Sequence, residues 1–305
     1  MSLDAALGGA GLGGFGYRST AEQVTEGLDL TGRTYLLTGC NSGLGLETLR
    51  VLHLRGGHVL AAARSESRAR EAIDAVSAEG TPVACDLAEP ASVRACVAAV
   101  KRLGRRLDGI ICNAGIMALP RRQHKAGCEL QLFTNHIGHF ILVTGLLAQL
   151  ADDGRVVMVS SRAHKRAPNE GIRFDDLGAE RSYSPWGSYG QSKLANLLFA
   201  RELARRLSGS ARTANALHPG VIRTNLGRHM SPVVRGALAL VGPLVLKTVR
   251  QGAATQCYLA THPAVAGVSG KYFVDCHEAV PSRQGRDDAL AERLWSVSEE
   301  IVGRV

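Results

Sequence analysis

The stretch TYLLTGCNSGLG, residues 34–45, joins a short apolar run to a glycine-rich turn. Residues 34–37 predict a strand, and the spacing of Leu46, Leu49 and Leu52 predicts a helix after the turn. Glycines let the backbone approach a pyrophosphate, which binds at a helix N-terminus because N–H groups are free there. We therefore expect the entry unit of a dinucleotide-binding fold. Its cofactor-binding residues would be Thr38, Gly39, Asn41, Ser42, Gly43, Leu44 and Gly45.

The remainder of the chain repeats this alternation of apolar strands and helices. Strands are expected at 58–63, 83–85, 108–112, 154–161, 213–217 and 271–274, and helices at 66–79, 90–103, 128–150, 189–207, 251–261 and 287–302. Residues 19–22 look like a capping box that opens a further short helix. With 305 residues and 45% apolar content, the chain can bury one large core. The fold class is α/β, a doubly wound Rossmann-type parallel sheet.

The predicted domain organisation is simple. A flexible tail covers residues 1–18, whose glycine- and alanine-rich start lacks the basic and apolar regions of a signal peptide. A single domain then covers 19–305. The apolar, interrupted segment at about 223–250 is expected to form a helical lid or substrate wall.

The amino-acid composition limits the kinds of ligand and cellular compartment to be expected. The net charge of +9 comes from scattered basic residues without a long basic block, so nucleic acid is not expected and a phosphorylated cofactor explains the excess more simply. Seven cysteines without a C-x-x-C pair favour neither a zinc cluster nor a disulfide framework, and a reducing cytoplasm fits best. Cys85 and Cys112 read as small buried hydrophobes. No run of eighteen apolar residues predicts a membrane span.

Residues at other expected strand ends extend the cofactor site. The strand 58–63 ends in Arg64-Ser65, where an acidic residue would accept from a ribose 2′-hydroxyl but an arginine would pair with a 2′-phosphate. NADP(H) is therefore favoured over NAD(H), with a solvated strand end as the alternative for Arg64. The other candidates at strand ends are Asp86, Leu87, Asn113, Ala114, Gly115, Pro219, Gly220, Val221 and Thr224.

Tyr189 and Lys193 form a second, independent signal. Side chains at positions i and i+4 lie on one face of a helix, so the ammonium of Lys193 can lie beside the phenol of Tyr189. A nearby cation stabilises the phenolate and lowers the pKa of a tyrosine, which prepares a proton donor and acceptor. An isolated Tyr-x-x-x-Lys pair is more often two solvated residues, so the pair gains meaning only from the other motifs.

Three histidines and one loop each allow more than one interpretation of their role. His136 and His139 are three residues apart, but no third metal ligand is evident nearby and no metal is expected. His164 follows the strand end at Ser161 and would either touch substrate or lie in solvent. A 27-residue loop, 162–188, separates that strand from Tyr189 and is expected to shape the substrate entrance.

Taken in order, these residues resemble the short-chain dehydrogenase/reductase family over about residues 31–280. The shared motifs are Thr38-Gly39-x-x-x-Gly43-x-Gly45, Asn113-Ala114-Gly115, Asn135, Ser161, Tyr189-x-x-x-Lys193 and Pro219-Gly220. Residues 20–28, 135–140, 192–199 and 252–276 resemble more narrowly the retinol-dehydrogenase-like branch, which includes the oxidoreductase domain of the WW-domain-containing oxidoreductase. The 162–188 loop is longer than is common in the family, so the substrate does not transfer from relatives.

The resemblance implies a catalytic role for each of four residues. Tyr189 would be the general acid/base, and Lys193 would lower its pKa and hold the nicotinamide ribose. Ser161 would hydrogen-bond the carbonyl oxygen, and Asn135 would position a proton-relay water. Ser161 is chosen over Ser160 because the family's serine is the second of such a pair, and because alternation along a strand sends the two to opposite sides.

The expected function is NADP(H)-dependent hydride transfer between nicotinamide and the carbonyl or alcohol of a lipophilic small molecule. The apolar run 236–249 motivates that substrate class. A cofactor-binding scaffold or redox sensor with little turnover is the alternative, although a scaffold needs neither the tyrosine nor the serine. Epimerase or dehydratase chemistry on a nucleotide sugar is a weaker third reading. A homo-oligomer is left open by the family resemblance.

Overall fold

The computed structural model describes residues 13–222 and 246–305. Within them, eight strands form one sheet in the order β10-β9-β8-β7-β4-β1-β2-β3. All neighbours are parallel except β10, which pairs antiparallel with β9. The strands are β1 (Thr34–Thr38), β2 (His58–Ala63), β3 (Gly80–Ala84), β4 (Leu107–Cys112), β7 (Leu150–Val159), β8 (Thr213–His218), β9 (Tyr272–Val274) and β10 (His277–Glu278). This order confirms the doubly wound α/β prediction.

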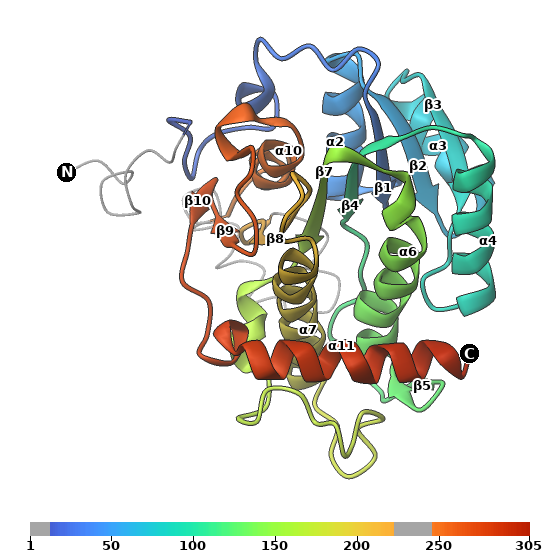
Figure 1. Ribbon diagram of the computed structural model, residues 1–305, viewed down its shortest axis with the longest axis vertical. Coiled ribbons are helices and arrows are strands. Elements are labelled where there is room, and N and C mark those ends of the chain that lie inside the picture. Colours follow the sequence, from blue (N-terminus) through green and yellow to red (C-terminus); the bar gives the residue numbers. More distant parts are fainter. Residues whose placement is uncertain (1–12, 223–245) are drawn as a thin grey trace, which may run out of the picture.

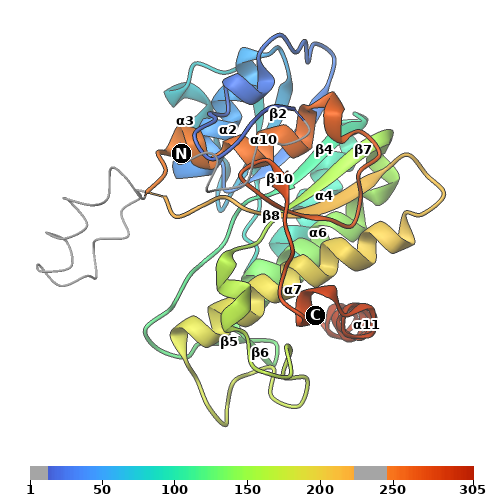
Figure 2. The same cartoon turned by 90° about the vertical axis from the view of Figure 1, so that its left-hand side faces the viewer.

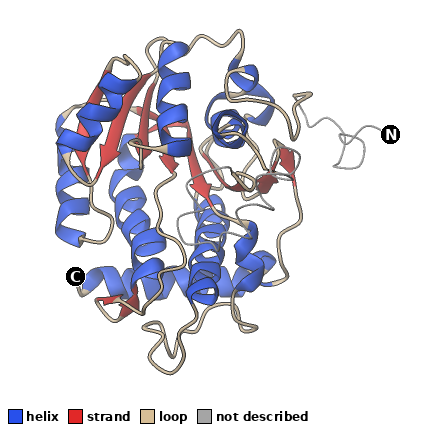
Figure 3. Ribbon diagram, turned by 180° about the vertical axis from the view of Figure 1, so that it is seen from behind, coloured by secondary structure: helices blue, strands red, loops and turns tan. Residues whose placement is uncertain are grey.

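Helices cover both faces of the sheet, as Figures 1 and 3 show. On one face lie α2 (Gly43–Leu54), α3 (Glu66–Ala75) and α10 (Ala254–Thr261), and on the other lie α4 (Pro90–Arg102), α6 (Gly138–Leu146) and α7 (Pro185–Arg206). The terminal helix α11 (Asp288–Gly303) packs against α7 (Figure 2). Alternate residues of β1 divide the core: Leu37 packs with the α2 side and Leu36 with the α4 side.

The order in which the strands are connected reverses between β1 and β4. From β1 the chain moves outward to β2 and β3, and then crosses back to β4 on the other side of β1. In such sheets, the carboxyl ends of the two central strands leave a crevice between them, because their connections diverge. Thr38 and Cys112 end these two strands, so the predicted glycine turn and the predicted Asn113-Ala114-Gly115 turn meet at one edge.

The expected helix at 128–150 is wrong in its details. The segment starts with a short hairpin of β5 (His124–Lys125) and β6 (Cys128–Glu129), followed by α5 (Leu130–Leu132). A π-helical turn then covers Phe133–Ile137 before α6 begins. The strand β7 starts at Leu150, earlier than expected, and ends at Val159, so both Ser160 and Ser161 follow the strand.

The expected 27-residue loop is also shorter than predicted. A 3₁₀ turn, η4, occupies Arg162–Arg166, and helix α7 begins at Pro185. Ser184 caps α7 by accepting a hydrogen bond from the Gly187 N–H at 3.3 Å, and proline suits the first helical position because it lacks an N–H. Tyr189 therefore lies inside α7 rather than at its first position, where the helix 189–207 was expected to start.

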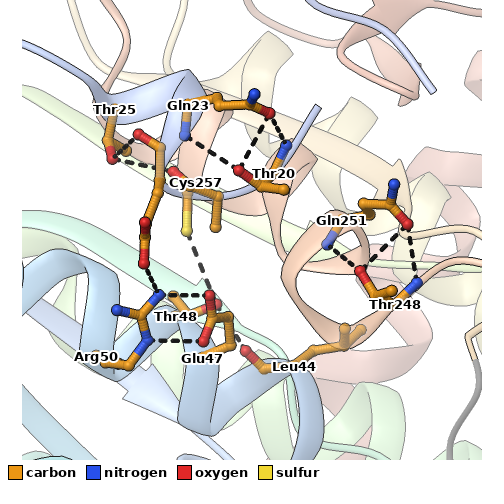
Figure 4. A network of polar contacts seen from close by, with 12 residues as sticks. Thr20, Gln23, Thr25, Leu44, Glu47, Thr48, Arg50, Thr248, Gln251 and Cys257 are labelled. Atoms are coloured by element: carbon orange, nitrogen blue, oxygen red, sulfur yellow. Dashed lines mark hydrogen bonds and ion pairs between the residues drawn. The ribbon is translucent and has the colours of Figure 1, made fainter. Parts of the chain in front are cut away.

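The N-terminal segment packs between α2 and the part of the chain from Arg250 through α10 (Figure 4). Thr20 and Gln23 make reciprocal hydrogen bonds at the start of a short 3₁₀ turn, η1 (Gln23–Thr25), where a capping box from Ser19 to Glu22 was expected. Arg50 of α2 bonds both Glu47 and Glu22, and the Ala21 N–H bonds the Arg250 carbonyl at 2.9 Å. These contacts fix α2, the helix that begins at the glycine turn.

The described end of the predicted tail, residues 13–18, contacts the domain. Phe15 packs edge-on against Tyr258 and His262, with ring centres 5.9 and 5.4 Å away. The rest of the tail, residues 1–12, and most of the predicted lid, residues 223–245, lie outside the described residues.

One helical run among the described residues is long and apolar enough to be considered as a membrane span. Leu130–Gln149 has 20 residues and a mean hydropathy of 1.2. It is also 78% buried inside the protein, as expected for a core helix, so it is weak evidence for a span.

Candidate active site

The glycine turn after β1 has the geometry that a nucleotide cradle requires. Gly39 and Gly43 have φ angles of 67° and 53°, which favour glycine. A Cβ on Gly45 would lie 2.0 Å from the Gly39 carbonyl oxygen, so no other residue fits there. Ser42, at the N-cap of α2, makes no side-chain cap, which leaves the first N–H groups of α2 without that partner. The open backbone of the glycine turn and the uncapped N–H groups of α2 therefore fit a cofactor that carries a pyrophosphate.

The hydroxyl of Thr38 joins the ends of the two central strands. Its Oγ1 accepts from the N–H groups of Asn113 and Ala114 at 3.0 and 3.1 Å. The Asn113 side chain in turn donates to the carbonyls of Thr38 and Gly39, at 2.9 and 3.2 Å. These bonds hold the Asn113-Ala114-Gly115 turn against the glycine turn, as their shared position at strand ends predicted.

Asn135 lies in the π-helical turn and is completely buried. Its side chain accepts from the Ile116 N–H at 2.8 Å and donates to the Ile116 carbonyl and to Ser192 Oγ, both at 2.9 Å. The amide group thus braces the chain beyond β4 against the turn of α7 that carries Lys193. Sequence reasoning missed Ser192, although it directly precedes Lys193.

His139 links Asn135 to Thr38. Its Nδ1 lies 2.9 Å from the Asn135 carbonyl, which can only accept, so Nδ1 carries the proton. Its Nε2 is then an acceptor and receives the Thr38 hydroxyl at 2.9 Å. His136 instead bonds Ser298 at 2.8 Å. The two rings serve different partners, and no group of three metal-ligand side chains occurs within residues 13–222 and 246–305.

Ser160 and Ser161 have separate partners. Ser160 is buried and donates to the Lys193 carbonyl at 2.7 Å, which anchors α7 to the end of β7. Ser161 Oγ accepts from the Ala163 N–H at 3.1 Å and shares a hydrogen bond with the Tyr189 phenol. The structure therefore brings Ser161, rather than Ser160, to the tyrosine.

Tyr189 and Lys193 lie together on α7. The Lys193 ammonium is 5.8 Å from the centre of the Tyr189 ring and donates to the Val159 carbonyl at 2.9 Å. Burial raises the pKa of the Tyr189 phenol, and the hydrogen bond with Ser161 offsets only part of that rise. In this geometry burial outweighs any lowering of this pKa by Lys193, whose ammonium donates to a backbone carbonyl.

Burial also lowers the pKa of the Lys193 ammonium to about 8. Near neutral pH, Lys193 is therefore mostly a cation and Tyr189 carries its proton. The pair can give a proton to an oxygen and then stabilise the phenolate that remains.

His164 is neither of the two things that the sequence suggested. It is 1% exposed, its Nδ1 lies 2.7 Å from the Ser161 carbonyl, and its Nε2 accepts from the Ser282 N–H at 3.0 Å. Because Nε2 is an acceptor, Nδ1 carries the proton and donates to Ser161. The neutral ring thus ties the backbone of the catalytic-serine candidate to the segment before α11.

A cleft of about 730 Å³ brings the two predicted sites together. Leu44 and Asn113 of the two strand-end turns line it, as do Ser161, Tyr189 and Lys193. Asn135 does not line the cleft. Its side chain lies behind Gly115 and fills the space beside it. The remaining described lining residues are Gly115, Ile116, Met117, Val159, Ser160, Arg162, Ala163, Lys165, Arg166, Trp186, His218, Pro219, Gly220, Val221 and Ile222.

The outer cofactor candidates occupy the same sheet edge. Arg64 is exposed after β2 and makes no hydrogen bond or ion pair with another described residue, while Ser65 caps α3 by accepting from the Arg68 N–H at 3.4 Å. Asp86 accepts from the Ala88 N–H at 3.0 Å, and Leu87 packs so closely on α6 that a Cβ on Gly138 would lie 2.3 Å from its carbonyl oxygen.

Behind the Pro219-Gly220 turn lies a buried cation that sequence reasoning missed. Lys247 is 1% exposed and pairs with Asp275, and a Cβ on Gly220 would lie 2.6 Å from the Lys247 side chain. The cation thus supports the turn from behind. The last cofactor candidate, Thr224, lies outside the described residues.

A doubly wound sheet with a glycine cradle at its reversal point and a Ser-Tyr-Lys cluster in the adjoining cleft defines a nicotinamide-dependent oxidoreductase. Comparison with known proteins identifies the family. The profile of the short chain dehydrogenase family matches residues 33–173. The chain belongs to this family, and to its retinol-dehydrogenase-like branch, as the motifs predicted.

Three relatives show how far the similarity extends. Short-chain dehydrogenase TIC 32 B, chloroplastic, of Brassica napus is 41% identical over 97% of this chain and 96% of its own length. Human retinol dehydrogenase 14 is 42% identical over 89% of this chain and 87% of its own length. A crystal structure of an uncharacterized protein from Mycobacterium paratuberculosis has a TM-score of 0.75 and 34% identity, covering 92% of this chain and 97% of that one.

Proposed function

We propose that this protein is an NADP(H)-dependent oxidoreductase that transfers hydride between nicotinamide and the carbonyl or alcohol of a lipophilic small molecule. The observation that carries the proposal is one cleft in which Leu44 of the glycine turn and Asn113 meet the Ser161, Tyr189 and Lys193 side chains. When bound, the nicotinamide supplies or accepts the hydride. The residues of this chain orient the substrate oxygen and move its proton.

The assignment of roles follows from the contacts. Ser161 Oγ accepts from the Ala163 N–H, and the hydroxyl proton that it can share with Tyr189 can be donated to a substrate oxygen instead. Tyr189 gives its proton to that oxygen as negative charge develops during reduction. Lys193 stays cationic and stabilises the phenolate. Asn135 holds Ile116 and Ser192 in place, and a proton-relay water would have to use its backbone carbonyl.

The cofactor-binding roles are assigned by position. The N–H groups of Asn41 to Leu44 would hold the pyrophosphate, and Asp86-Leu87 the adenine. The other turns at the sheet edge, with Tyr189 and Lys193, would hold the nicotinamide half. Arg64 and Ser65 would hold a 2′-phosphate, which favours NADP(H), because Arg64 is exposed and unpaired within the described residues.

A lipophilic substrate is supported by the cleft entrance. Met117, Trp186 and Val221 are 40%, 43% and 54% exposed, and all three line the cleft. Large exposed apolar side chains gathered at one opening indicate an apolar ligand. The predicted wall, residues 236–249, is described only at 246–249 and contributes no argument here.

The decisive experiment is a screen of ketones and aldehydes, including retinal because of the retinol dehydrogenase relative, with NADPH oxidation followed by absorbance. We expect turnover with NADPH, slower turnover with NADH, and reversal with the product alcohol and NADP⁺. Tight NADPH binding without turnover of any carbonyl would overturn the proposal and favour a scaffold. We place the protein in the cytoplasm, because its seven cysteines are free thiols, although one relative is chloroplastic; fractionation of the source cells tests this.

A further inference from the structure

The substrate side of the cleft carries an unusual charge distribution. Arg162, Lys165 and Arg166, all from η4, line the cleft next to Ser161 and are exposed. No aspartate or glutamate is among the described lining residues. His218, also in the lining, has its pKa lowered to about 3 by burial and by nearby cations, Arg162 first among them, so it is neutral. The cleft wall is therefore cationic beside the reacting groups.

These three cations differ from the other basic residues of the same connection. Arg173 pairs with Glu170 at 3.0 Å and Arg181 pairs with Asp175 at 2.5 Å. By contrast, within the described part of the chain, none of the three cleft cations forms an ion pair. The acidic side chains of the loop thus neutralise its outer arginines, and the inner cations are left to face the cleft.

An aromatic contact fixes one of these cations relative to the chemistry. Trp186 lies edge-on to Tyr189, with ring centres 6.0 Å apart, and the Arg166 guanidinium lies over the indole, 5.2 Å from its centre. A cation over an indole face is held by the ring's electron density, and its N–H groups still project outward. Arg166 is therefore positioned one aromatic ring away from the proton donor.

The positions of these groups indicate which chemical groups the substrate carries. A carbonyl at Tyr189 would be followed by an apolar stretch along Trp186 and then by the Arg166 guanidinium, with Arg162 and Lys165 on the same turn. These three exposed cations lie close together and repel one another, and an anionic group of the substrate lowers that repulsion.

We infer that the preferred substrate is an anionic amphiphile, a carbonyl compound whose apolar body ends in a carboxylate or similar anion that meets Arg162, Lys165 and Arg166. This inference rests on the proposed function and specifies its substrate class. It departs from a purely neutral lipophile, for which the basic patch would serve no purpose.

The test compares two probes of equal length, 9-oxodecanoate and its methyl ester. Steady-state rates with NADPH are measured for both, and calorimetry gives the affinity of both for the enzyme saturated with NADP⁺. We expect wild-type enzyme to favour the acid by about tenfold, the effect of one hydrogen bond to a charged group. Added salt and the triple variant R162Q/K165Q/R166Q should each bring the acid-to-ester ratio toward one.

A matched control changes the overall charge without touching the cleft. The triple variant R102Q/R105Q/R106Q removes three cations just before β4, at the sheet edge opposite the catalytic one. It should keep the wild-type preference for the acid. If it loses the preference as fully as the cleft variant, the effect comes from net charge and the inference is overturned.

The remaining outcomes separate this inference from the proposed function. If calorimetry shows the acid no tighter than the ester, or neither bound, the inference fails even when other ketones are reduced. If the acid binds more tightly but no carbonyl in the whole screen turns over, the function fails and the anionic site stands. A parallel loss of NADPH affinity in the cleft variant would assign the three cations to the cofactor and overturn the inference.

Discussion

The β1–β4 half of the sheet and the β7–β9 half contribute to the cleft in different ways. In the first half, function depends on backbone: two glycines with positive φ, a Gly45 that admits no Cβ, and uncapped N–H groups. In the second half it depends on side chains, among them Ser161, Tyr189 and Lys193. A backbone cradle binds any nucleotide of the right shape, whereas side chains select a reaction and a substrate.

Tyr189→Phe is the strongest test of the separate roles of the two halves. Loss of the phenolic proton should lower the rate of carbonyl reduction by about a thousandfold, within the usual range for a general acid. Affinity for NADPH should change little, because the glycine cradle and Lys193 are kept and only the phenolic hydroxyl is lost. Turnover of the variant and cofactor fluorescence measure the two effects, and unchanged turnover would remove Tyr189 from the chemistry.

Gly45→Ala should have the reverse effect. Its Cβ would lie 2.0 Å from the Gly39 carbonyl oxygen, so the turn must open, and NADPH affinity should fall by about a hundredfold or more. Gly303→Ala near the end of α11 is the matched control, because nothing lies within 4 Å of its added Cβ. Equal NADPH dissociation constants for the two variants would contradict a backbone cradle.

Arg64 tests whether the first half also uses a side chain. Arg64→Asp should weaken NADPH binding by about tenfold and shift preference toward NADH, because a carboxylate repels a 2′-phosphate and can accept from a ribose hydroxyl. The ratio of kcat/KM values for the two cofactors measures the shift. A wild-type preference for NADH would refute the cofactor choice before any variant is made.

Stability should also depend on pH through buried histidines in both halves of the sheet. Burial lowers the pKa of His139 to about 4 and of His136 and His218 to about 3, and it also lowers that of His164. The unfolded chain takes up these protons near pH 6.5, so stability is fully present above that pH and is lost below it. The slope should be about 1.4 kcal/mol per pH unit for each histidine.

Urea unfolding between pH 7.5 and 5.5 measures this slope. His164→Gln should make the slope shallower, because a proton on Nε2 would face the Ser282 N–H in the folded protein. His124→Gln is the control, since His124 is exposed. A slope that does not change between His164→Gln and wild type would mean that His164 is charged in the folded state.

The extent to which the sequence predicted the molecule follows the same division. The glycine turn was readable because tight backbone conformations permit few residue types, and local spacing shows them directly. Ser161 was distinguishable from Ser160 because chain alternation separates them. The roles of His139 and His164 were not readable, since each depends on a partner more than 100 residues away, Thr38 and Ser282.

The boundaries of elements near the site were predicted less well for a related reason. The π-helical turn at Phe133–Ile137 has no distinct signal in the local sequence. Its Asn135 makes hydrogen bonds to Ile116 and Ser192, which are distant in the sequence. The start of α7 could have been found, because Ser184-Pro185 is a regular helix start. The net direction of the Tyr189 pKa shift differs from the expected one because burial outweighs the groups that stabilise the phenolate.

All seven cysteines are free and buried, and burial raises the pKa of the Cys40 and Cys128 thiols to about 11. The thiolate, which is the form that attacks alkylating reagents, is therefore scarce and shielded. Maleimide labelling of the native protein should proceed only as fast as the structure opens. The cysteines thus supply built-in reporters of local opening, spread from Cys40 beside the nucleotide cradle to Cys276 near the last strands, without any engineered label.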